Sequence, residues 1–209
     1  MTDRLVFVKV NGWEDTLTAQ EWGVRGYPTL VLMNADGSEI DRVPGFMPAE
    51  DFVQTMDDYA NGIGTLDDLL GRYAGKPDSI QLCMEIGAKY QYRGKDSLAE
   101  SYYRTVIDQD PGNKSAVADD AAFRLALNTY YEGEEKYDDA IAAFSDVVKR
   151  YPGSDMAEES ATYVPYVMAK QGKEAEALKL YQQFLIDYPE SDEVDWVNRQ
   201  IKALTPEAS

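Results

Sequence analysis

The spacing of apolar residues near the start of the chain first predicts extended structure. Residues 5–10 form a continuous run rich in β-branched side chains, which is typical of a buried strand. Residues 16–23 have helical spacing and end at a glycine. Two short apolar runs, 29–33 and 40–43, flank an Asn-Ala-Asp-Gly turn. This part of the chain therefore predicts a strand, a short helix and a β-hairpin.

The next apolar pattern has the period of an amphipathic helix. It begins after Pro48, and Gly62 and Gly64 end it. Its apolar positions are Phe52, Val53, Met56, Tyr59 and Ala60. Residues 65–70 predict a further capped helix that connects to the remainder of the chain, with a break at residues 75–77.

One string within the first pattern resembles a known family. Residues 23–29 read Gly-Val-Arg-Gly-Tyr-Pro-Thr, and residues 4–61 are similar to the distal portion of a thioredoxin. The resemblance implies that Tyr27, Pro28 and Thr29 form the cis-proline loop, which faces a Cys-x-x-Cys pair in that family. Pro28 then either lines a peptide-binding groove or only shapes a loop.

The family's catalytic half has no counterpart in this sequence. The sole cysteine, Cys83, lies far downstream. The missing family strand would lie between strands 5–10 and 29–33, so both have unpaired edges unless they pair directly or with another chain. We expect either a three-stranded sheet in a monomer or a homodimer through the open edge.

From residue 79 onward the sequence repeats itself. In three successive units an alanine precedes an aromatic residue by four positions, and the aromatic residue precedes a proline by eight: Ala99, Tyr103 and Pro111; Ala140, Phe144 and Pro152; Ala177, Tyr181 and Pro189. This spacing resembles tetratricopeptide (TPR) repeats of the bacterial envelope type. A small alanine lets two helices approach, the aromatic residue fills the gap to the next hairpin, and proline ends the helix.

The repeat register also predicts the core and the end of the array. The expected core residues are Cys83, Ala99, Tyr103, Ala140, Phe144, Ala177 and Tyr181. Residues 192–204 predict a polar-backed capping helix with Ser191 or Asp192 as its N-cap. Pro165 lies inside a predicted helix, where we expect a kink.

Arrays of this family bind peptide segments in a groove lined by the first helix of each repeat. Carried over by position, the expected peptide-binding residues are Gln81, Met84, Gln91, Arg124, Asn128, Tyr131, Thr162 and Tyr166. Met84 occupies a position where the co-chaperone type of carboxylate clamp needs a polar residue, so we expect no such clamp. Ordinary solvated helix faces remain the alternative for each residue.

Composition narrows the possible chemistry. The net charge of −18 repels polyphosphate, so nucleic acid is not an expected partner. With no histidine and one cysteine, we expect no metal site, no cofactor and no catalytic residues. No run is apolar enough to span a membrane, so we expect a soluble chain without membrane insertion. A periplasmic and a cytoplasmic location both remain possible.

The expected fold class is α+β: a truncated thioredoxin-like α/β unit followed by an all-α TPR solenoid of about three helix hairpins plus a capping helix. The expected domains are residues 1–63, a connecting segment 64–77 and repeats 78–209. The expected function is a non-catalytic protein–protein interaction scaffold with a redox-inactive thioredoxin-like remnant. The alternative is a fragment of a thiol-disulfide oxidoreductase whose Cys-x-x-Cys half lies upstream of Met1, in which case a longer natural protein could be an enzyme.

Overall fold

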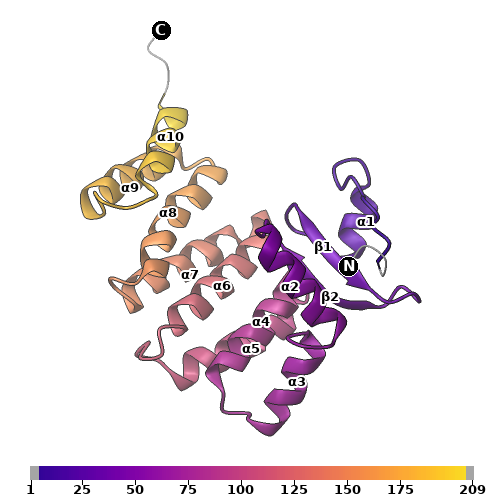
Figure 1. Ribbon diagram of the computed structural model, residues 1–209. Coiled ribbons are helices and arrows are strands. Elements are labelled where there is room, and N and C mark those ends of the chain that lie inside the picture. Colours follow the sequence, from indigo (N-terminus) through magenta and orange to yellow (C-terminus); the bar gives the residue numbers. More distant parts are fainter. Residues whose placement is uncertain (1–4, 206–209) are drawn as a thin grey trace. The chain divides into compact units, whose positions relative to one another are not determined.

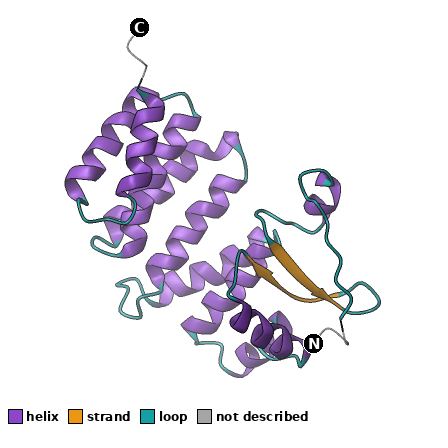
Figure 2. Cartoon of the chain, turned by 45° about the horizontal axis from the view of Figure 1, so that its top comes forward, coloured by secondary structure: helices purple, strands orange, loops and turns teal. Residues whose placement is uncertain are grey.

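The computed structural model describes residues 5–205 (Figure 1). Its first elements, in chain order, are α1 (Thr16–Glu21), β1 (Thr29–Met33), β2 (Glu39–Pro44), α2 (Ala49–Ala60) and α3 (Leu66–Gly75). The helical repeats follow as α4 (Ile80–Tyr92), α5 (Asp96–Gln109), α6 (Ala118–Tyr131), the short 3-10 helix η1 (Glu134–Lys136), α7 (Tyr137–Arg150), α8 (Asp155–Lys170), α9 (Glu174–Asp187) and α10 (Val194–Leu204). The α+β class expected from the sequence is confirmed, because strands occur before residue 45 and helices follow (Figure 2).

The chain divides into two compact units within α5. Unit 1 is Met1–Tyr102 and unit 2 is Tyr103–Ser209. The thioredoxin-like segment therefore shares unit 1 with α3, α4 and the first half of α5. The domain limits expected from the sequence, at residues 63 and 77, stay a prediction.

The sheet of unit 1 consists of two antiparallel strands within the described residues. β1 and β2 pair from Thr29 opposite Pro44 to Leu32 opposite Asp41, and the register shifts after Leu32. One face packs on α2 through Leu32, Val43 and Met56, which are all less than a tenth exposed. The predicted hairpin and the helix after Pro48 are thus confirmed.

The prediction of a strand at residues 5–10 is wrong. These residues have no regular secondary structure, and neither the three-stranded sheet nor direct pairing with β1 forms among the described residues. Val6, Phe7 and Val8 are 92%, 63% and 81% exposed. A strand needs a partner for its backbone N–H and C=O groups, and the family strand that would separate this run from β1 is not in the sequence.

In unit 1, α3 and α4 form a second apolar cluster. Thr65 and Ser79 cap the two helices, since each hydroxyl accepts a hydrogen bond from a backbone N–H three residues later. Leu69, Leu82 and Ile86 are buried in this cluster. The helix predicted at residues 65–70 is confirmed as α3, whereas its role as a connection between domains stays a prediction.

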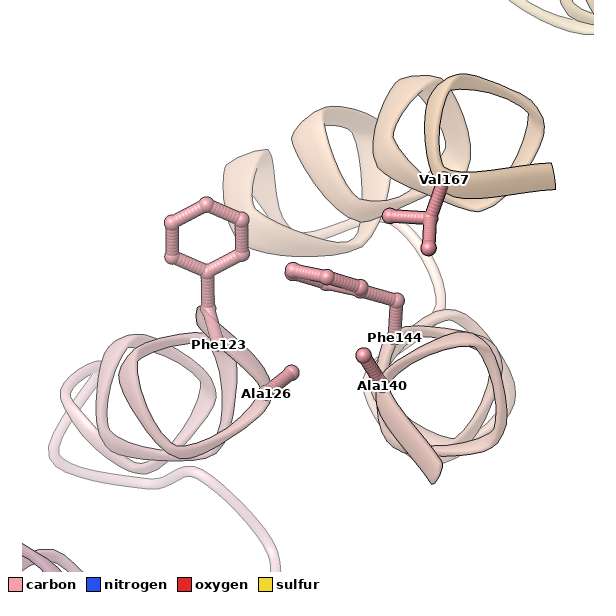
Figure 3. Close-up of a cluster of buried hydrophobic side chains, with 5 residues drawn as sticks. All are labelled: Phe123, Ala126, Ala140, Phe144 and Val167. Atoms are coloured by element: carbon pink, nitrogen blue, oxygen red, sulfur yellow. The ribbon is translucent and has the colours of Figure 1, made fainter. Parts of the chain in front are cut away.

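Unit 2 has the packing that the repeat spacing predicts. α6 packs on α7, α7 on α8, α8 on α9 and α9 on α10. Figure 3 shows the Phe144 ring pointing into the space between α6 and α8, toward Phe123 and Val167, with Ala126 and Ala140 where the helices approach. All seven core residues predicted for the array are fully buried, at 0% exposure.

The structure adds detail to the predictions for the capping helix α10 and for Pro165 in α8. The N-cap of α10 is Glu193 rather than Ser191 or Asp192, because the Ser191 hydroxyl accepts its hydrogen bond from the Glu193 N–H, before the helix starts. α8 continues through Pro165, which is buried. The apolar face of α10 packs on α9 as expected for a capping helix, with Val197 fully buried.

Candidate functional site

The cis-proline loop of unit 1 is formed and exposed. The Tyr27–Pro28 peptide bond is cis, as the family resemblance implies. The Thr29 hydroxyl donates to the Gly26 carbonyl at 2.8 Å, and the Pro28 carbonyl accepts from the Gly45 N–H at 2.7 Å. Tyr27 is 48% exposed and stacks at a tilt against Trp13, with 5.4 Å between ring centroids. This loop presents aromatic surface but no nucleophile.

The only cysteine of the sequence lies on α4. Cys83 is 0% exposed and free. Burial raises the pKa of the Cys83 thiol, and a hydrogen bond with Tyr73 opposes this only in part. A buried thiol with a raised pKa is a poor nucleophile, because the thiolate is the reactive form. Cys83 therefore acts as a small core residue.

The expected groove residues of the first repeat lie on α4 in unit 1. Gln81 is exposed and Met84 is half-buried, but Gln91 is only 4% exposed. A peptide could reach the first two side chains without rearrangement of the helix. The assignment of these positions to a groove remains a prediction.

The remaining expected groove residues are brought together in unit 2, where α6 lies beside α8. Arg124 and Tyr166 are half-buried, whereas Asn128 and Thr162 are 4% and 3% exposed. The Thr162 hydroxyl is used within α8, where it donates to the Glu159 carbonyl at 2.8 Å. The side chain of Tyr131, at the end of α6, lies outside the described part of the structure.

A group of carboxylates surrounds Arg124 on this face of unit 2. Burial raises the pKa of Glu159, and the nearby carboxylates of Glu193, Asp155 and Asp120 raise it further, whereas Arg124 opposes the shift. Burial also raises the pKa of Asp120, and again Arg124 acts in the opposite direction. Negative charge therefore accumulates between α6, α8 and the start of α10.

Aromatic rings continue the same face toward the end of α8. Tyr166 lies 6.2 Å from Tyr130 and 6.1 Å from Trp196, measured between ring centroids. Tyr166, Tyr130 and Trp196 are all half-buried, so they present ring surface without being sealed in the core. A face that combines carboxylates with accessible aromatic rings suits a polypeptide partner, since Tyr and Trp are enriched at interfaces.

A buried charge network in unit 1 was missed by the sequence analysis. Asp41 on β2 is 0% exposed, and its two oxygens accept four hydrogen bonds, from the N–H groups of Arg42 and Leu66 and from the side chains of Lys89 and Arg93. The two side-chain bonds are 2.8 and 3.0 Å long. Asp41 thereby joins the sheet to the first turn of α3 and to α4.

Glu39 and Arg42 extend this network. Arg42 is 4% exposed, pairs with Glu39, and donates to the backbone carbonyls of Trp22 and Tyr92 at 2.8 and 2.9 Å. Arg93 also pairs with Glu39, at 3.0 Å. The signal for this network was present in the sequence, because two opposite charges interrupt an otherwise apolar strand at residues 40–43.

Within residues 5–205, no three acidic or sulfur side chains are arranged to hold a metal ion. None of the helices in this range is both long and apolar enough to cross a membrane.

Comparison with known proteins finds similarity to a different family at each end of the chain. Residues 1–60 match the family model described as Thioredoxin-like domain. Thioredoxin 1 of Synechococcus elongatus is 36% identical over 56 residues, which make up 27% of this chain and 51% of that protein. The chain thus spans about half the length of this curated relative.

The second family match covers most of unit 2. Residues 115–205 match the family model YfiO, described as Outer membrane lipoprotein. Among solved structures, the crystal structure of MamA aligns with a TM-score of 0.48 and 13% identity, over 77% of this chain and 94% of that one. The sequence interpretation, a thioredoxin-like segment followed by TPR-like helical repeats, is confirmed by the two family matches.

Proposed function

We propose that this chain is a non-catalytic scaffold that binds a protein or peptide partner across α6 and α8 of unit 2. The observation that carries the proposal is the face formed by Arg124, Glu159, Tyr166 and Trp196, where charged and aromatic side chains from three helices are half-buried or exposed beside a fully packed core. Helical repeats of this kind offer an extended surface that suits a peptide segment. The partner is a polypeptide and not a nucleic acid, because the chain carries 38 acidic and 20 basic residues.

The thioredoxin-like segment is proposed to be redox-inactive. A dithiol enzyme cycles between two thiols and a disulfide, and this sequence contains one cysteine. That cysteine is buried on α4. The loop then serves as surface, with Tyr27 and Trp13 exposed, and not as part of an active site.

An insulin-reduction assay tests the absence of catalysis. We expect the chain to give no turnover above a Cys83→Ser variant in the presence of dithiothreitol. Turnover that the Cys83→Ser variant lacks would contradict the proposal.

A display selection tests partner binding. Random peptides are selected on the wild-type chain and then titrated against a Tyr166→Ala variant and a matched Tyr73→Ala variant, since Tyr73 is half-buried on α3 in unit 1. We expect specific peptides that lose affinity for Tyr166→Ala only. Failure to select any peptide, or equal losses in both variants, would contradict a groove across α6 and α8.

A second candidate function rests on the intact cis-proline loop. The chain matches about half of a thioredoxin, so it can also be the distal half of a thiol-disulfide oxidoreductase whose Cys-x-x-Cys half is encoded upstream. Sequencing the genomic region before the Met1 codon separates the two candidates. A Trp-Cys-x-x-Cys motif in frame some 15 to 30 codons upstream would favour the enzyme, and a stop codon in that interval would favour the scaffold.

We also propose that the scaffold self-associates through the open edge of β1. The run Val6, Phe7 and Val8 is exposed and carries no charge, and an open strand edge such as that of β1 pairs readily with an apolar segment of this kind. A two-fold exchange would give both copies a continuous sheet. Sedimentation across a concentration series should show a dimer that a Phe7→Lys substitution dissociates. A monomer at all concentrations for both chains would rule this dimer out.

A further inference from the structure

Unit 1 contains a small cleft that the proposed function does not use. The cleft has a volume of about 260 Å³ and is bounded by β2, α2, α3 and α4. Its apolar walls are Pro44, Leu69, Ala88 and the rings of Tyr59 and Tyr92. Its charged lining is Arg42, Lys89 and Arg93, with Glu85 also present. The volume lies just below that of pockets for drug-sized ligands, so it suits a ligand of about one residue.

The buried charges beneath this cleft are not balanced, although the exposed Glu85 in its lining makes the cations and carboxylates equal in number. Three cations, Arg42, Lys89 and Arg93, pair with only two carboxylates, Glu39 and Asp41. All five side chains are at most 16% exposed, so water screens the excess positive charge poorly. The imbalance is notable in a chain whose net charge is −18, and it favours an anionic occupant.

The same side chains retain unused hydrogen-bond donors. Lys89 Nζ carries three hydrogens and donates to Asp41 at 2.8 Å and to the Tyr59 hydroxyl at 3.1 Å, which leaves one donor. Among the described residues, Arg93 Nε has no acceptor, because this guanidinium bonds through Nη1 and Nη2. The Tyr59 hydroxyl accepts from Lys89 and keeps its own hydrogen to donate. The cleft therefore offers hydrogen-bond donors to a ligand that carries acceptor atoms.

We propose that this cleft binds a carboxylate borne on an apolar group, of the size of the C-terminal residue of a peptide. The carboxylate accepts from Lys89, Arg93 and Tyr59, and the apolar group lies against Pro44, Leu69 and Ala88. A bare phosphate would satisfy the donors but leave the apolar walls in contact with water. The apolar walls thus distinguish the two anions.

The site is held in place before a ligand arrives. Asp41 fixes Lys89 and Arg93, while two backbone carbonyls and Glu39 fix Arg42. Binding then costs little ordering of long side chains, which otherwise offsets much of the gain from a charged contact. Glu85 is exposed and forms no ion pair among the described residues, so it acts only as a screened repulsive charge.

Two small probes of equal size test the chemistry. N-acetyl-leucine carries a carboxylate, and N-acetyl-leucinamide carries a neutral amide in the same place. We expect the acid to shift the Ala88 methyl resonance in a saturable way and the amide to leave it unchanged. Saturable binding of both probes, or of neither up to 20 mM, on the order of weak fragment affinities, would overturn the proposal.

The source of the carboxylate is distinguished by a third probe, hexanoate. Tighter binding of N-acetyl-leucine than of hexanoate supports a peptide C-terminus, because the acetamide adds contacts that an alkyl chain lacks. Tighter binding of hexanoate would overturn the peptide assignment.

Variants test the position of the site. Glu85→Gln removes the repulsive charge and should tighten N-acetyl-leucine binding about two- to fivefold, as exposed charges do. Glu176→Gln, the same change on an exposed part of α9, should leave affinity unchanged. Ala88→Phe should abolish binding by filling the cleft, with folding checked by circular dichroism. Unchanged affinity in both Glu85→Gln and Ala88→Phe would place the ligand elsewhere and overturn the proposal.

Discussion

The apolar side chains of unit 2 are buried much more completely than those at the start of unit 1. In unit 2, Phe144 and Tyr181 are fully buried, and each hairpin packs on the next along the sequence. In unit 1, Val6 and Val8 are more than four-fifths exposed, although they belong to a run as apolar as any core segment. Helical repeats close their core through neighbours in the sequence, whereas a strand depends on a partner that can be far away or missing.

Among substitutions that test this comparison, we expect the largest loss of stability at Phe144. This ring is 0% exposed and lies 5.6 Å from Phe123 and 4.8 Å from Tyr163, between ring centroids. Phe144→Ala should lower the free energy of unfolding by about 3–5 kcal/mol, through lost burial and the cavity left behind. Urea denaturation measures it, with Ile186→Ala as the control because Ile186 is 71% exposed. A loss below about 0.5 kcal/mol at Phe144 would mean that the repeat register is wrong.

A smaller loss is expected at Asp41, where polar contacts fasten the sheet to α3 and α4. Asp41→Asn leaves Lys89 without its buried counter-charge and removes one of the two carboxylates that pair with Arg93. It should cost about 3 kcal/mol of unfolding free energy, the lower end for a broken buried pair. The exposed control Asp57→Asn should stay within about 0.5 kcal/mol. Equal stabilities for the two variants would show that the network does not hold unit 1 together.

The sequence predicted the parts of the fold that depend on local spacing. The Ala-aromatic-Pro repeat placed Tyr103, Phe144 and Tyr181 in the core, because four-residue and eight-residue offsets fix which helical faces meet. The hairpin was equally predictable from its turn. The strand at residues 5–10 was wrong, since its apolar pattern holds only when another strand supplies hydrogen bonds.

The candidate sites were predicted less completely for a related reason. Offsets along a helix led to Arg124 and Tyr166 as expected groove residues, and their role stays a prediction. The same offsets did not indicate Glu159 or Glu193, which become neighbours only when α6, α8 and the start of α10 pack. Asp41 could not be paired with Lys89 from the sequence, because 48 residues separate them. Contacts between distant elements require the fold itself.

The smallest expected effect is a pH-dependent change in stability that arises from the carboxylates of unit 2. The pKa of Glu159 is raised above its ordinary value of 4.5 by burial and by Glu193, Asp155 and Asp120. The folded state therefore binds its proton more tightly than the unfolded state, so the ionised side chain destabilises unit 2 as pH rises above about 4.5. Glu159→Gln should raise the melting temperature at pH 7, and the gain should vanish as pH falls below that value.

The exposed residue Glu190 provides the control for this pH dependence. Glu190→Gln removes the same charge from the chain, so any general relief of repulsion appears in both variants. We expect Glu190→Gln to raise the melting temperature at pH 7 by much less than Glu159→Gln does, because the Glu190 side chain is exposed to water. A Glu159→Gln profile that matches it would show that Glu159 is solvated like any surface carboxylate.

The most direct test of the scaffold proposal compares how much one substitution in unit 2 and one in the cis-proline loop lower the affinity for a peptide. A peptide selected on the wild-type chain is titrated calorimetrically against Tyr166→Ala, in the face of unit 2, and Tyr27→Ala, in the cis-proline loop. We predict a loss of affinity of about tenfold or more for Tyr166→Ala, as for a central aromatic contact, and less than about twofold for Tyr27→Ala. The reverse result, with Tyr27→Ala abolishing binding and Tyr166→Ala leaving it intact, would contradict the account and assign recognition to the thioredoxin-like segment.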